Sequence, residues 1–255
     1  MHNENTMNAK HTFALYTSQA LPHSEETTQP YTFQDAAIAH RLGRILRLQT
    51  GEKIQIFNQQ YVMHATIHTI ANKHVQLIVK SVRQLKPLAP IIHILLPLLK
   101  KDALHDAIYT CVEMGANNIN LMITEKTHKQ SYTARDHERI HAIMVAAAEQ
   151  SKQFALPEIH EPQPVAHCIS NYSFSGYRIR FDPEGNFPLS LHFRHMQSHT
   201  PKNIILAIGP EGDFTEQEKT LLLQAGFLSC PLTPTVLRAQ QALAVGLGAM
   251  RSCCR

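Results

Sequence analysis

Residues 206–218 read LAIGPEGDFTEQE and hold the clearest local pattern in the chain. An apolar run over 204–208 ends at Gly209, and Thr215 is followed three residues later by Glu218, the spacing of a capping box at the start of a helix. A strand that ends in a glycine-containing turn and leads into a helix is where α/β proteins often hold ligands. This stretch therefore predicts a ligand-binding turn between a strand and a helix.

The same alternation of strand and helix extends through the chain after residue 90. Apolar runs predict strands over 91–96, 119–123, 177–181, 204–208 and 228–232. The helical spacing of apolar residues predicts helices over 104–112, 140–147, 215–226 and 240–250. Strands that alternate with helices are typical of a parallel sheet, so this part is predicted to be an α/β domain.

The N-terminal part has a different pattern, with short strands and a single helix. The spacing of Ile38, Leu42 and Ile45 predicts a helix over 34–48 that buries this face. Short β-type runs, which together predict a small β-barrel, occupy 11–16, 53–57, 61–67 and 74–80. Two prolines within 86–90 predict an extended linker, so the expected domains are 1–86 and 87–255.

The composition limits the class of protein. The 255 residues are 44% hydrophobic and 17% charged, which allows a folded core, and the net charge of +4 permits a nucleic-acid partner without requiring one. No apolar run is long enough for a membrane helix and the N-terminal residues lack an apolar signal segment, so a cytoplasmic protein is expected. The cysteines contain no CxxC pair and the histidines no HExxH, so we expect neither a metal site nor a disulfide framework.

Common nucleotide-binding motifs are missing from the glycine pattern. The sequence has no GxxxxGK[ST] segment, and its only GxG, from Gly246 to Gly248, lies in the last predicted helix rather than after the first strand of its domain. These facts disfavour a P-loop site and a dinucleotide-dependent oxidoreductase. We interpret the two glycines as a site of close packing, within the domain or across a dimer.

A second loop rich in proline, at 229–238, could form one pocket with the turn at 209–212. Glycine allows the backbone to approach a ligand closely, and proline fixes a loop at little entropic cost. Such a pocket would bind mainly through backbone groups, which suits an uncharged adenine and a methionine-like tail. Another Pro-Glu-Gly, at 183–185, follows Asp182 and is interpreted as an ordinary turn.

Five segments, in order along the chain, resemble a known family of RNA-modifying enzymes. The segment 208–215, IGPEGDFT, resembles the IGPEGG[FL][ST] loop of the SPOUT methyltransferases, which contain an α/β trefoil knot. The other four resemble, more narrowly, the ribosomal RNA small subunit methyltransferase E family: HRLGRILRLQTG at 40–51, VEMG at 112–115, EQS at 149–151 followed by Pro157, and LTPTVLRAQQA at 232–242. The resemblance extends over about residues 11–251.

This resemblance implies a fold, an activity and partners. The expected fold is a SPOUT-type α/β trefoil-knot domain preceded by a small PUA-like β-barrel that binds RNA, and the expected assembly is a homodimer. The implied reaction is S-adenosylmethionine-dependent methylation of a uracil N3 in 16S ribosomal RNA. Its implied substrate is the assembled small ribosomal subunit rather than free RNA.

The pattern and the resemblance together indicate candidate site residues. Arg238 ends the second loop and begins a helix, so it is expected to stabilise the anion of the deprotonated uracil. Glu211 or Asp213 is a candidate general base, or water takes the proton, and Glu211 could instead brace the knot. The expected cofactor-binding residues are Thr124, Ile208, Gly209, Pro210, Gly212, Leu232, Val236 and Leu237. The expected RNA-binding residues are the stripe of His40, Arg44 and Arg47 on the polar helix face, with Lys100 and Lys101.

Several positions depart from the family pattern. Asp213 replaces the second glycine of GPEGG. In the last segment, Thr233 and Thr235 replace the glycine and the first arginine of LG.RILR, and Gln240 and Gln241 replace the glutamate and threonine of ETA. Gln153 stands near the position of the arginine in EQS.R. Backbone-lined cofactor loops tolerate such changes better than side-chain contacts to RNA do. A knotted methyltransferase that acts on another RNA and a non-catalytic RNA-binding assembly factor therefore stay open as alternatives.

Overall fold

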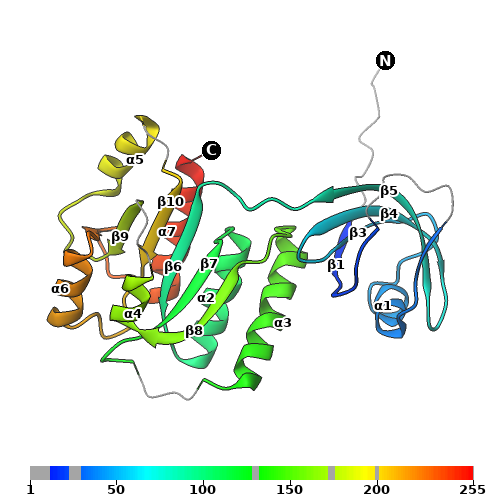
Figure 1. Ribbon diagram of the computed structural model, residues 1–255, viewed down its shortest axis with the longest axis horizontal. Coiled ribbons are helices and arrows are strands. Elements are labelled where there is room, and N and C mark those ends of the chain that lie inside the picture. Colours follow the sequence, from blue (N-terminus) through cyan, green and yellow to red (C-terminus); the bar gives the residue numbers. More distant parts are fainter. Residues whose placement is uncertain (1–11, 23–29, 128–131, 172–175, 199–200, 255) are drawn as a thin grey trace. The chain divides into compact units, whose positions relative to one another are not determined.

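The structure is a computed structural model that describes residues 12–22, 30–127, 132–171, 176–198 and 201–254. The chain divides into two compact units, the first ending at Leu85 and the second beginning at Lys86 (Figure 1). This division falls at the start of the proline-containing segment 86–90. Each unit contains a separate sheet.

The first unit contains five strands in the order β1-β3-β4-β5-β2. Strand β1 pairs in parallel with β3, and the other neighbouring strands are antiparallel. Apolar side chains of the strands share one buried core with Ile38 and Leu42. The strands are β1 (Phe13–Tyr16), β2 (Tyr31–Phe33), β3 (Lys53–Phe57), β4 (Tyr61–Ile70) and β5 (Val75–Gln84). The sequence predicts β3 within its observed bounds but does not predict β2, whose three residues are too few to show a period.

The predicted helix over 34–48 is wrong in its second half. Asp35 caps a short α-helix, α1 (Ala36–His40), which is followed by a π-helix, η1 (Arg41–Ile45). The N–H group of Leu46 donates to the Arg41 carbonyl at 2.9 Å, five residues back, so the turn is wider than an α-turn.

This wider turn changes which side chains face the core. Ile45 is 61% exposed instead of buried, and Leu46 packs against the core. Arg47 has a φ of 53° and lies beyond the π-helix, so His40, Arg44 and Arg47 do not form the single helical stripe predicted from an i, i+4, i+7 spacing.

The second unit contains six strands that all pair in parallel, in the order β11-β9-β10-β6-β7-β8. This confirms the predicted parallel α/β class. The central strands are buried on both faces, which explains why they read as continuous apolar runs. The strands are β6 (Ile91–Pro97), β7 (Asn118–Ile123), β8 (Glu158–Pro164), β9 (Tyr177–Phe181), β10 (Asn203–Ala207) and β11 (Leu228–Cys230).

The helices of this unit pack in two main groups (Figure 1). Helix α2 (Lys101–Glu113) packs with both α3 (Ala134–Ser151) and α7 (Ala239–Cys253), and α5 (Leu189–Ser198) contacts α7. Helices α4 (Val165–Ser170) and α6 (Glu216–Gln224) pack together and share a buried cluster with strand residues that include Leu95 and Ile205. The sequence does not predict β8, α4 or α5; β8 is a polar edge strand, EIHEPQP, without an apolar period.

The strand order reverses between β6 and β10. From β6 the chain proceeds to β7 and β8 on one side, and it later returns to place β10 and β9 on the other side. Because the strands are parallel, the turns after β6, β7, β9, β10 and β11 all leave from one edge of the sheet. A reversal of this kind is where open α/β sheets hold ligands.

Candidate active site

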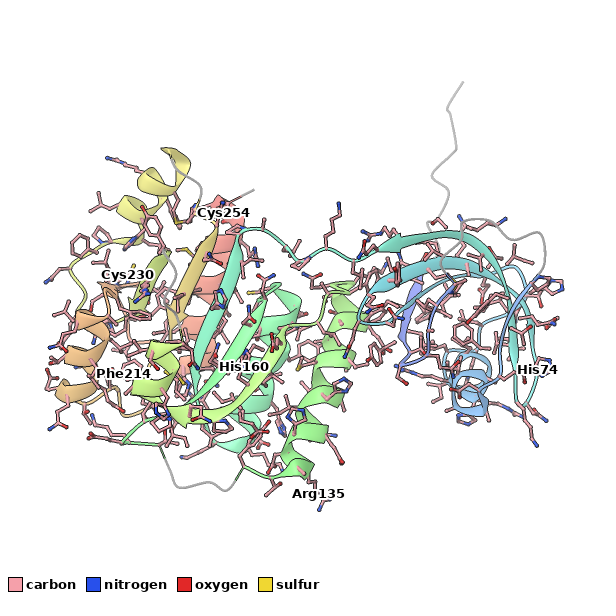
Figure 2. All side chains as sticks on the ribbon, in the orientation of Figure 1. His74, Arg135, His160, Phe214, Cys230 and Cys254 are labelled. Atoms are coloured by element: carbon pink, nitrogen blue, oxygen red, sulfur yellow. The ribbon has the colours of Figure 1, made fainter. Side chains whose placement is uncertain are left out.

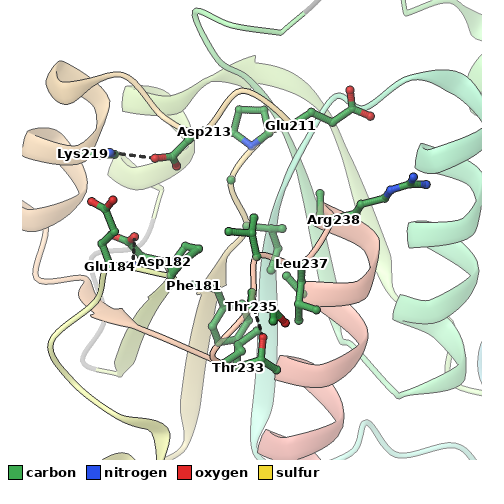
Figure 3. A pocket seen from close by; sticks show the side chains of 18 residues that line it. Phe181, Asp182, Glu184, Glu211, Asp213, Lys219, Thr233, Thr235, Leu237 and Arg238 are labelled. Carbon is green, nitrogen blue, oxygen red and sulfur yellow. Dashed lines mark hydrogen bonds and ion pairs between the residues drawn. The ribbon is translucent and has the colours of Figure 1, made fainter.

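A cavity of about 430 Å³, called the main pocket below, lies at the carboxyl edge of the parallel sheet (Figure 3). It is formed by the turns after β9, β10 and β11, together with the start of α7 and one residue of α6. The residues that line it are 181–184, 208–211, Asp213, Lys219, Leu232, Thr233, 235–239 and Ala242.

The turn after β10 continues the sheet for one residue and then leaves it. The Ile208 N–H group donates to the Leu95 carbonyl at 3.0 Å, and the Asp213 N–H group closes the turn on the Pro210 carbonyl at 2.9 Å. Asp213 has a φ of 58°, in the left-handed region. Its carboxylate accepts the Phe214 N–H group at 2.7 Å, a local hydrogen bond that helps aspartate to adopt this conformation.

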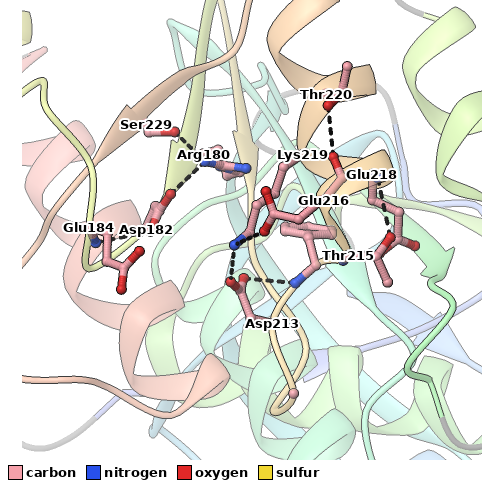
Figure 4. A network of polar contacts seen from close by, with 12 residues as sticks. Arg180, Asp182, Glu184, Asp213, Thr215, Glu216, Glu218, Lys219, Thr220 and Ser229 are labelled. Atoms are coloured by element: carbon pink, nitrogen blue, oxygen red, sulfur yellow. Dashed lines mark hydrogen bonds and ion pairs between the residues drawn. The ribbon is translucent and has the colours of Figure 1, made fainter.

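The Asp213 carboxylate also fixes the start of α6. It forms an ion pair with Lys219 Nζ at 2.9 Å, and Glu216 Oε1 lies 3.0 Å from the same nitrogen (Figure 4). Hydrogen bonds to these two carboxylates raise the pKa of Lys219. Lys219 therefore stays charged and links the turn to the helix that follows it.

Glu218 connects two turns that are distant in sequence. Its Oε2 atom accepts the Thr215 N–H group at 2.9 Å, and Thr215 Oγ1 accepts the Glu218 N–H group at 3.3 Å, which confirms the predicted capping box. Its Oε1 atom accepts the N–H group of Glu125, in the turn after β7, at 2.9 Å. Glu218 is only 5% exposed. Lys126 adds a second connection, because its Nζ atom donates to the Gly212 carbonyl at 2.6 Å.

The turn after β9 is held by its own first residue. Asp182 Oδ1 accepts the Glu184 N–H group at 3.0 Å, and the Asp182 carbonyl accepts the Gly185 N–H group at 3.0 Å. Asp182 Oδ2 accepts a hydrogen bond from Arg180, which also donates to Ser229 (Figure 4). The segment is a turn, as the sequence predicts, and it also lines the main pocket, which the sequence interpretation did not include.

The loop after β11 and the start of α7 complete the pocket. Thr233 Oγ1 donates to the Thr235 carbonyl at 2.7 Å, and Val236 is 81% exposed at the pocket wall. Arg238 is the N-cap residue of α7, and its side chain makes no capping hydrogen bond. A Cβ atom on Gly246 would lie 2.1 Å from the ring of Phe181, so the predicted close packing of this glycine occurs within the domain.

The structure brings together eight of the ten predicted catalytic and cofactor-binding residues in the main pocket: Glu211, Arg238, Ile208, Gly209, Pro210, Leu232, Val236 and Leu237. Thr124 and Gly212 do not line it. Thr124 is buried, and its N–H and hydroxyl groups contact Thr127 Oγ1 at 3.0 and 2.7 Å. Gly212 faces the Lys126 side chain: a Cβ atom added to Gly212 would lie 3.2 Å from Lys126 Cδ.

The predicted RNA-binding residues lie in three places. Lys100 forms an ion pair with Glu211, 3.6 Å between Nζ and Oε2, at the edge of the main pocket. Lys101 lines a different cavity. His40, Arg44 and Arg47 are exposed residues of the first unit.

Sequence reasoning missed several residues of the site, among them four with charged side chains. Asp182, Glu184 and Lys219 line the main pocket, and Glu218 is predicted as a helix cap but not as the partner of Glu125. The available signal for Asp182 and Glu184 was their position directly after a predicted parallel strand. The bond between Glu218 and Glu125 joins residues 93 positions apart, and no local pattern records it.

Two other properties bear on the chemistry of the site. Among the residues that the structure describes, no group of three or more His, Cys, Asp or Glu side chains could hold a metal ion, and no helix is long and apolar enough to cross a membrane. The five cysteines are free, and burial raises the pKa of Cys230 to about 12, so this thiol is not a ready nucleophile.

Comparison with known proteins identifies the family. The model of the RNA methyltransferase domain family matches residues 86–251. Ribosomal RNA small subunit methyltransferase E of Synechocystis sp. (strain ATCC 27184 / PCC 6803 / Kazusa) is 30% identical over 211 residues, which cover 82% of this chain and 68% of the relative. The protein of the same name from Buchnera aphidicola subsp. Schizaphis graminum is 26% identical over 222 residues, which cover 83% of this chain and 86% of the relative.

Solved structures show the same fold. Ribosomal RNA small subunit methyltransferase E from Neisseria gonorrhoeae, solved bound to S-adenosyl methionine, superposes with a TM-score of 0.81 at 20% identity over 95% of this chain and 98% of that chain. A Legionella pneumophila protein solved with its cofactor SAM gives a TM-score of 0.78 at 23% identity over 95% and 98%. With the family match and the 30% identical relative, this chain belongs to the ribosomal RNA small subunit methyltransferase E family.

Proposed function

We propose that the protein transfers a methyl group from S-adenosylmethionine to a uracil N3 of 16S ribosomal RNA in the assembled small subunit. The observation that carries this proposal is the main pocket, in which eight residues expected from the sequence line one cavity beside the reversal point of a parallel sheet. Membership of the family supports RNA methylation. The motif resemblance supports the uracil N3 and the assembled subunit as the target.

The pocket fits S-adenosylmethionine, the ligand of the Neisseria gonorrhoeae relative. Its volume of about 430 Å³ lies within the range of small-molecule sites. Gly209 lines the pocket without a side chain, and a Cβ atom at this position would lie 3.3 Å from Asp213 Oδ1, so the turn has little room for one. The carboxylate of Glu184 favours a cationic ligand, whereas that of Asp182 is already paired with Arg180. When bound, S-adenosylmethionine supplies an activated methyl group on a positively charged sulfonium.

Arg238 is proposed to act on the uracil ring. Uracil N3 becomes nucleophilic when its proton leaves, and the resulting negative charge spreads to O2 and O4. Within the described parts of the chain, no carboxylate forms a salt bridge with Arg238, so its guanidinium is free to donate to these oxygens and to stabilise the charge.

Glu211 is proposed to accept the N3 proton or to orient the water that accepts it. Glu211 and Arg238 extend toward the same side of the main pocket (Figure 3). The ion pair with Lys100 orients the Glu211 carboxylate, yet both side chains stay more than half exposed, so a substrate can reach them.

The remaining expectations form part of the same proposal. The first unit is proposed to be a PUA-like β-barrel that binds RNA phosphates through His40, Arg44 and Arg47, with Lys100 contributing from the second unit. The second unit is proposed to contain a trefoil knot and to form a homodimer in the cytoplasm. Thr124 and Gly212 remain proposed contributors to the cofactor site through the turns that they stabilise.

The first experiment uses labelled S-adenosylmethionine and small subunits that lack their native uracil N3 methyl group. We expect label on one uracil N3 of 16S ribosomal RNA, located by mass spectrometry of nuclease fragments. An Arg238→Gln variant should transfer methyl groups about 100-fold more slowly while it binds S-adenosylmethionine normally. Absence of label from the unaltered protein, with intact S-adenosylmethionine binding, would favour another RNA or a non-catalytic assembly factor.

A further inference from the structure

A second cavity, of about 500 Å³, lies between the N-terminal turns of α2 and α3. We call it the α2–α3 cleft. Each helix supplies two basic side chains four residues apart, which places them on one face: Lys101 and His105 from α2, and Arg135 and Arg139 from α3. Figure 2 marks Arg135 near the beginning of α3. The other lining residues are Asp102 and Asp136.

The acidic residues of the cleft neutralise its cations only in part. Asp136 Oδ2 accepts the N–H group of Thr133 at 3.0 Å and its hydroxyl at 2.6 Å, so this carboxylate caps α3. Throughout the described residues, Lys101, Arg135 and Arg139 form no salt bridge with a carboxylate. Three cations and two carboxylates leave an excess of positive charge before His105 is counted.

Two further observations indicate a positive potential in the cleft. Burial, and after it the charges of Arg139 and Lys101, lower the pKa of His105, while Asp102 and Asp106 act in the opposite direction with smaller effect. The N-terminus of α2, whose first residue is Lys101, also lies at the cleft and adds the partial positive charge of a helix end. An anion in the cleft would interact favourably with these cations and with this helix end.

The cleft begins beside the main pocket. Lys100 pairs with Glu211, which lines the main pocket, and the next residue, Lys101, lines the cleft. The Cα atoms of Lys100 and Lys101 are separated by about 3.8 Å, the spacing across one trans peptide. A polyanion that places one group in the main pocket therefore has its neighbouring charges within reach of the cleft.

We propose that the α2–α3 cleft binds a backbone phosphate of the RNA, close to the nucleotide that enters the main pocket. This inference rests on the proposed function, because it assigns a second contact to the same RNA. Arg135 and Arg139 donate to the phosphate oxygens, for which the planar guanidinium is well suited, and Lys101 adds a point charge. Contacts of this kind position RNA without reading its sequence.

The test compares the unaltered protein with the double variant Arg135→Gln/Arg139→Gln. Binding to protein-free 16S ribosomal RNA and to small subunits is measured over a range of salt concentrations. We expect the double variant to bind about 10-fold more weakly, and its log–log salt slope to be shallower by roughly 1.4, the value for two phosphate contacts on a single strand. S-adenosylmethionine affinity should be unchanged, which shows that the variant is folded.

The matched control removes one charge elsewhere. Lys202→Gln, at an exposed position before β10, is compared with Arg139→Gln alone and should change neither affinity nor salt slope. If Lys202→Gln and Arg139→Gln changed RNA affinity and salt slope equally, the inference would be overturned, because the arginine would then act only through the net charge of the protein. It would also be overturned if the double variant bound small subunits as tightly and with the same salt slope as the unaltered protein.

Two further outcomes separate the sources of phosphate and the two proposals. If inorganic phosphate alone bound the cleft and RNA affinity did not depend on Arg135 and Arg139, the site would be one for a free anion and the inference would be wrong. If the double variant behaved as expected but the unaltered protein methylated no uracil, the cleft would stand and the proposed reaction would fail.

Discussion

Two turns with the same tripeptide, Pro-Glu-Gly at 183–185 and at 210–212, meet at one pocket but are held in place differently. The first is fixed by its own hydrogen bond, in which Asp182 accepts the Glu184 N–H group, and by the adjacent strand β11, against which its glycine packs. The second is fixed from outside: Lys126 donates to the Gly212 carbonyl, and a buried glutamate of α6 anchors the neighbouring turn.

This difference shows that the tripeptide does not determine what a turn does. Both turns line the pocket because each follows a parallel strand at the same edge of the sheet. Their dependence on the rest of the protein differs. A change in the first turn acts on the turn itself and on β11, whereas the second turn can be altered through α6 or through the turn after β7.

The largest effect is expected at Gly185, and Gly212 is its comparison. In Gly185→Ala the new Cβ atom would lie 2.6 Å from the backbone carbonyl of Ser229, which cannot move aside, so we expect a loss of about 3 kcal/mol in the free energy of unfolding. In Gly212→Ala the nearest atom is the flexible Lys126 side chain at 3.2 Å, and the loss should stay below about 1 kcal/mol. Urea unfolding measures both; equal losses would contradict the distinction between the turns.

The packing of α7 behind the first turn gives the next largest effect. Gly246→Ala forces the Phe181 ring to move, and we expect a loss of about 2 kcal/mol in stability together with roughly 10-fold weaker S-adenosylmethionine binding, because Phe181 lines the main pocket. Gly248→Ala is the control: its Cβ atom would meet Met114 at an ordinary 3.7 Å, and alanine should stabilise the helix by up to about 1 kcal/mol. Thermal unfolding and calorimetric titration test the pair.

A smaller effect is expected where the second turn is anchored from outside. Glu218→Gln replaces one of two accepting oxygens with an N–H₂ group that faces a backbone N–H group, so stability should fall by about 1.5 kcal/mol. The control, Glu216→Gln, alters a side chain that is 89% exposed, and its effect should stay within about 0.5 kcal/mol. If the two variants proved equally stable, the link between Glu218 and Glu125 would contribute nothing.

The smallest net effect is expected at Asp213. Asp213→Gly relieves a left-handed conformation at φ 58° but removes the hydrogen bond from Phe214 and the ion pair with Lys219. These changes oppose each other, so stability should change by less than about 1 kcal/mol. Asp213→Val keeps the conformational strain without the hydrogen bond and should be less stable than Asp213→Gly in the same unfolding measurement.

Much of the second unit could be predicted because its central strands are buried on both faces and show continuous apolar runs. The turn at 209–212 could be located for the same reason, since it follows such a run and precedes a capping box that the structure contains. Asp213 looked like a departure from a glycine pattern, yet its left-handed φ is the conformation that glycine adopts readily and aspartate tolerates.

Other features could not be predicted because they depend on contacts that sequence periodicity does not record. Ile45 is exposed since a π turn displaces it from the 3.6-residue period. The polar edge strand β8 gave no apolar signal. The short turn at 182–185 gave a correct local prediction, but its place in the pocket follows only from the strand order, in which β9 lies next to β10.

The carboxylate that Glu125 and Thr215 share has a consequence for hydrogen exchange. Because the two amide groups donate to the two oxygens of one carboxylate, an opening that displaces the Glu218 side chain exposes both amides, and they should then exchange as one cooperative unit. The Glu184 amide, bonded within its own turn, should exchange independently. The pocket wall formed by the turn after β10 should therefore open together with the turn after β7, whereas the wall formed by the turn after β9 should open alone. A bound ligand would slow amide exchange in both walls.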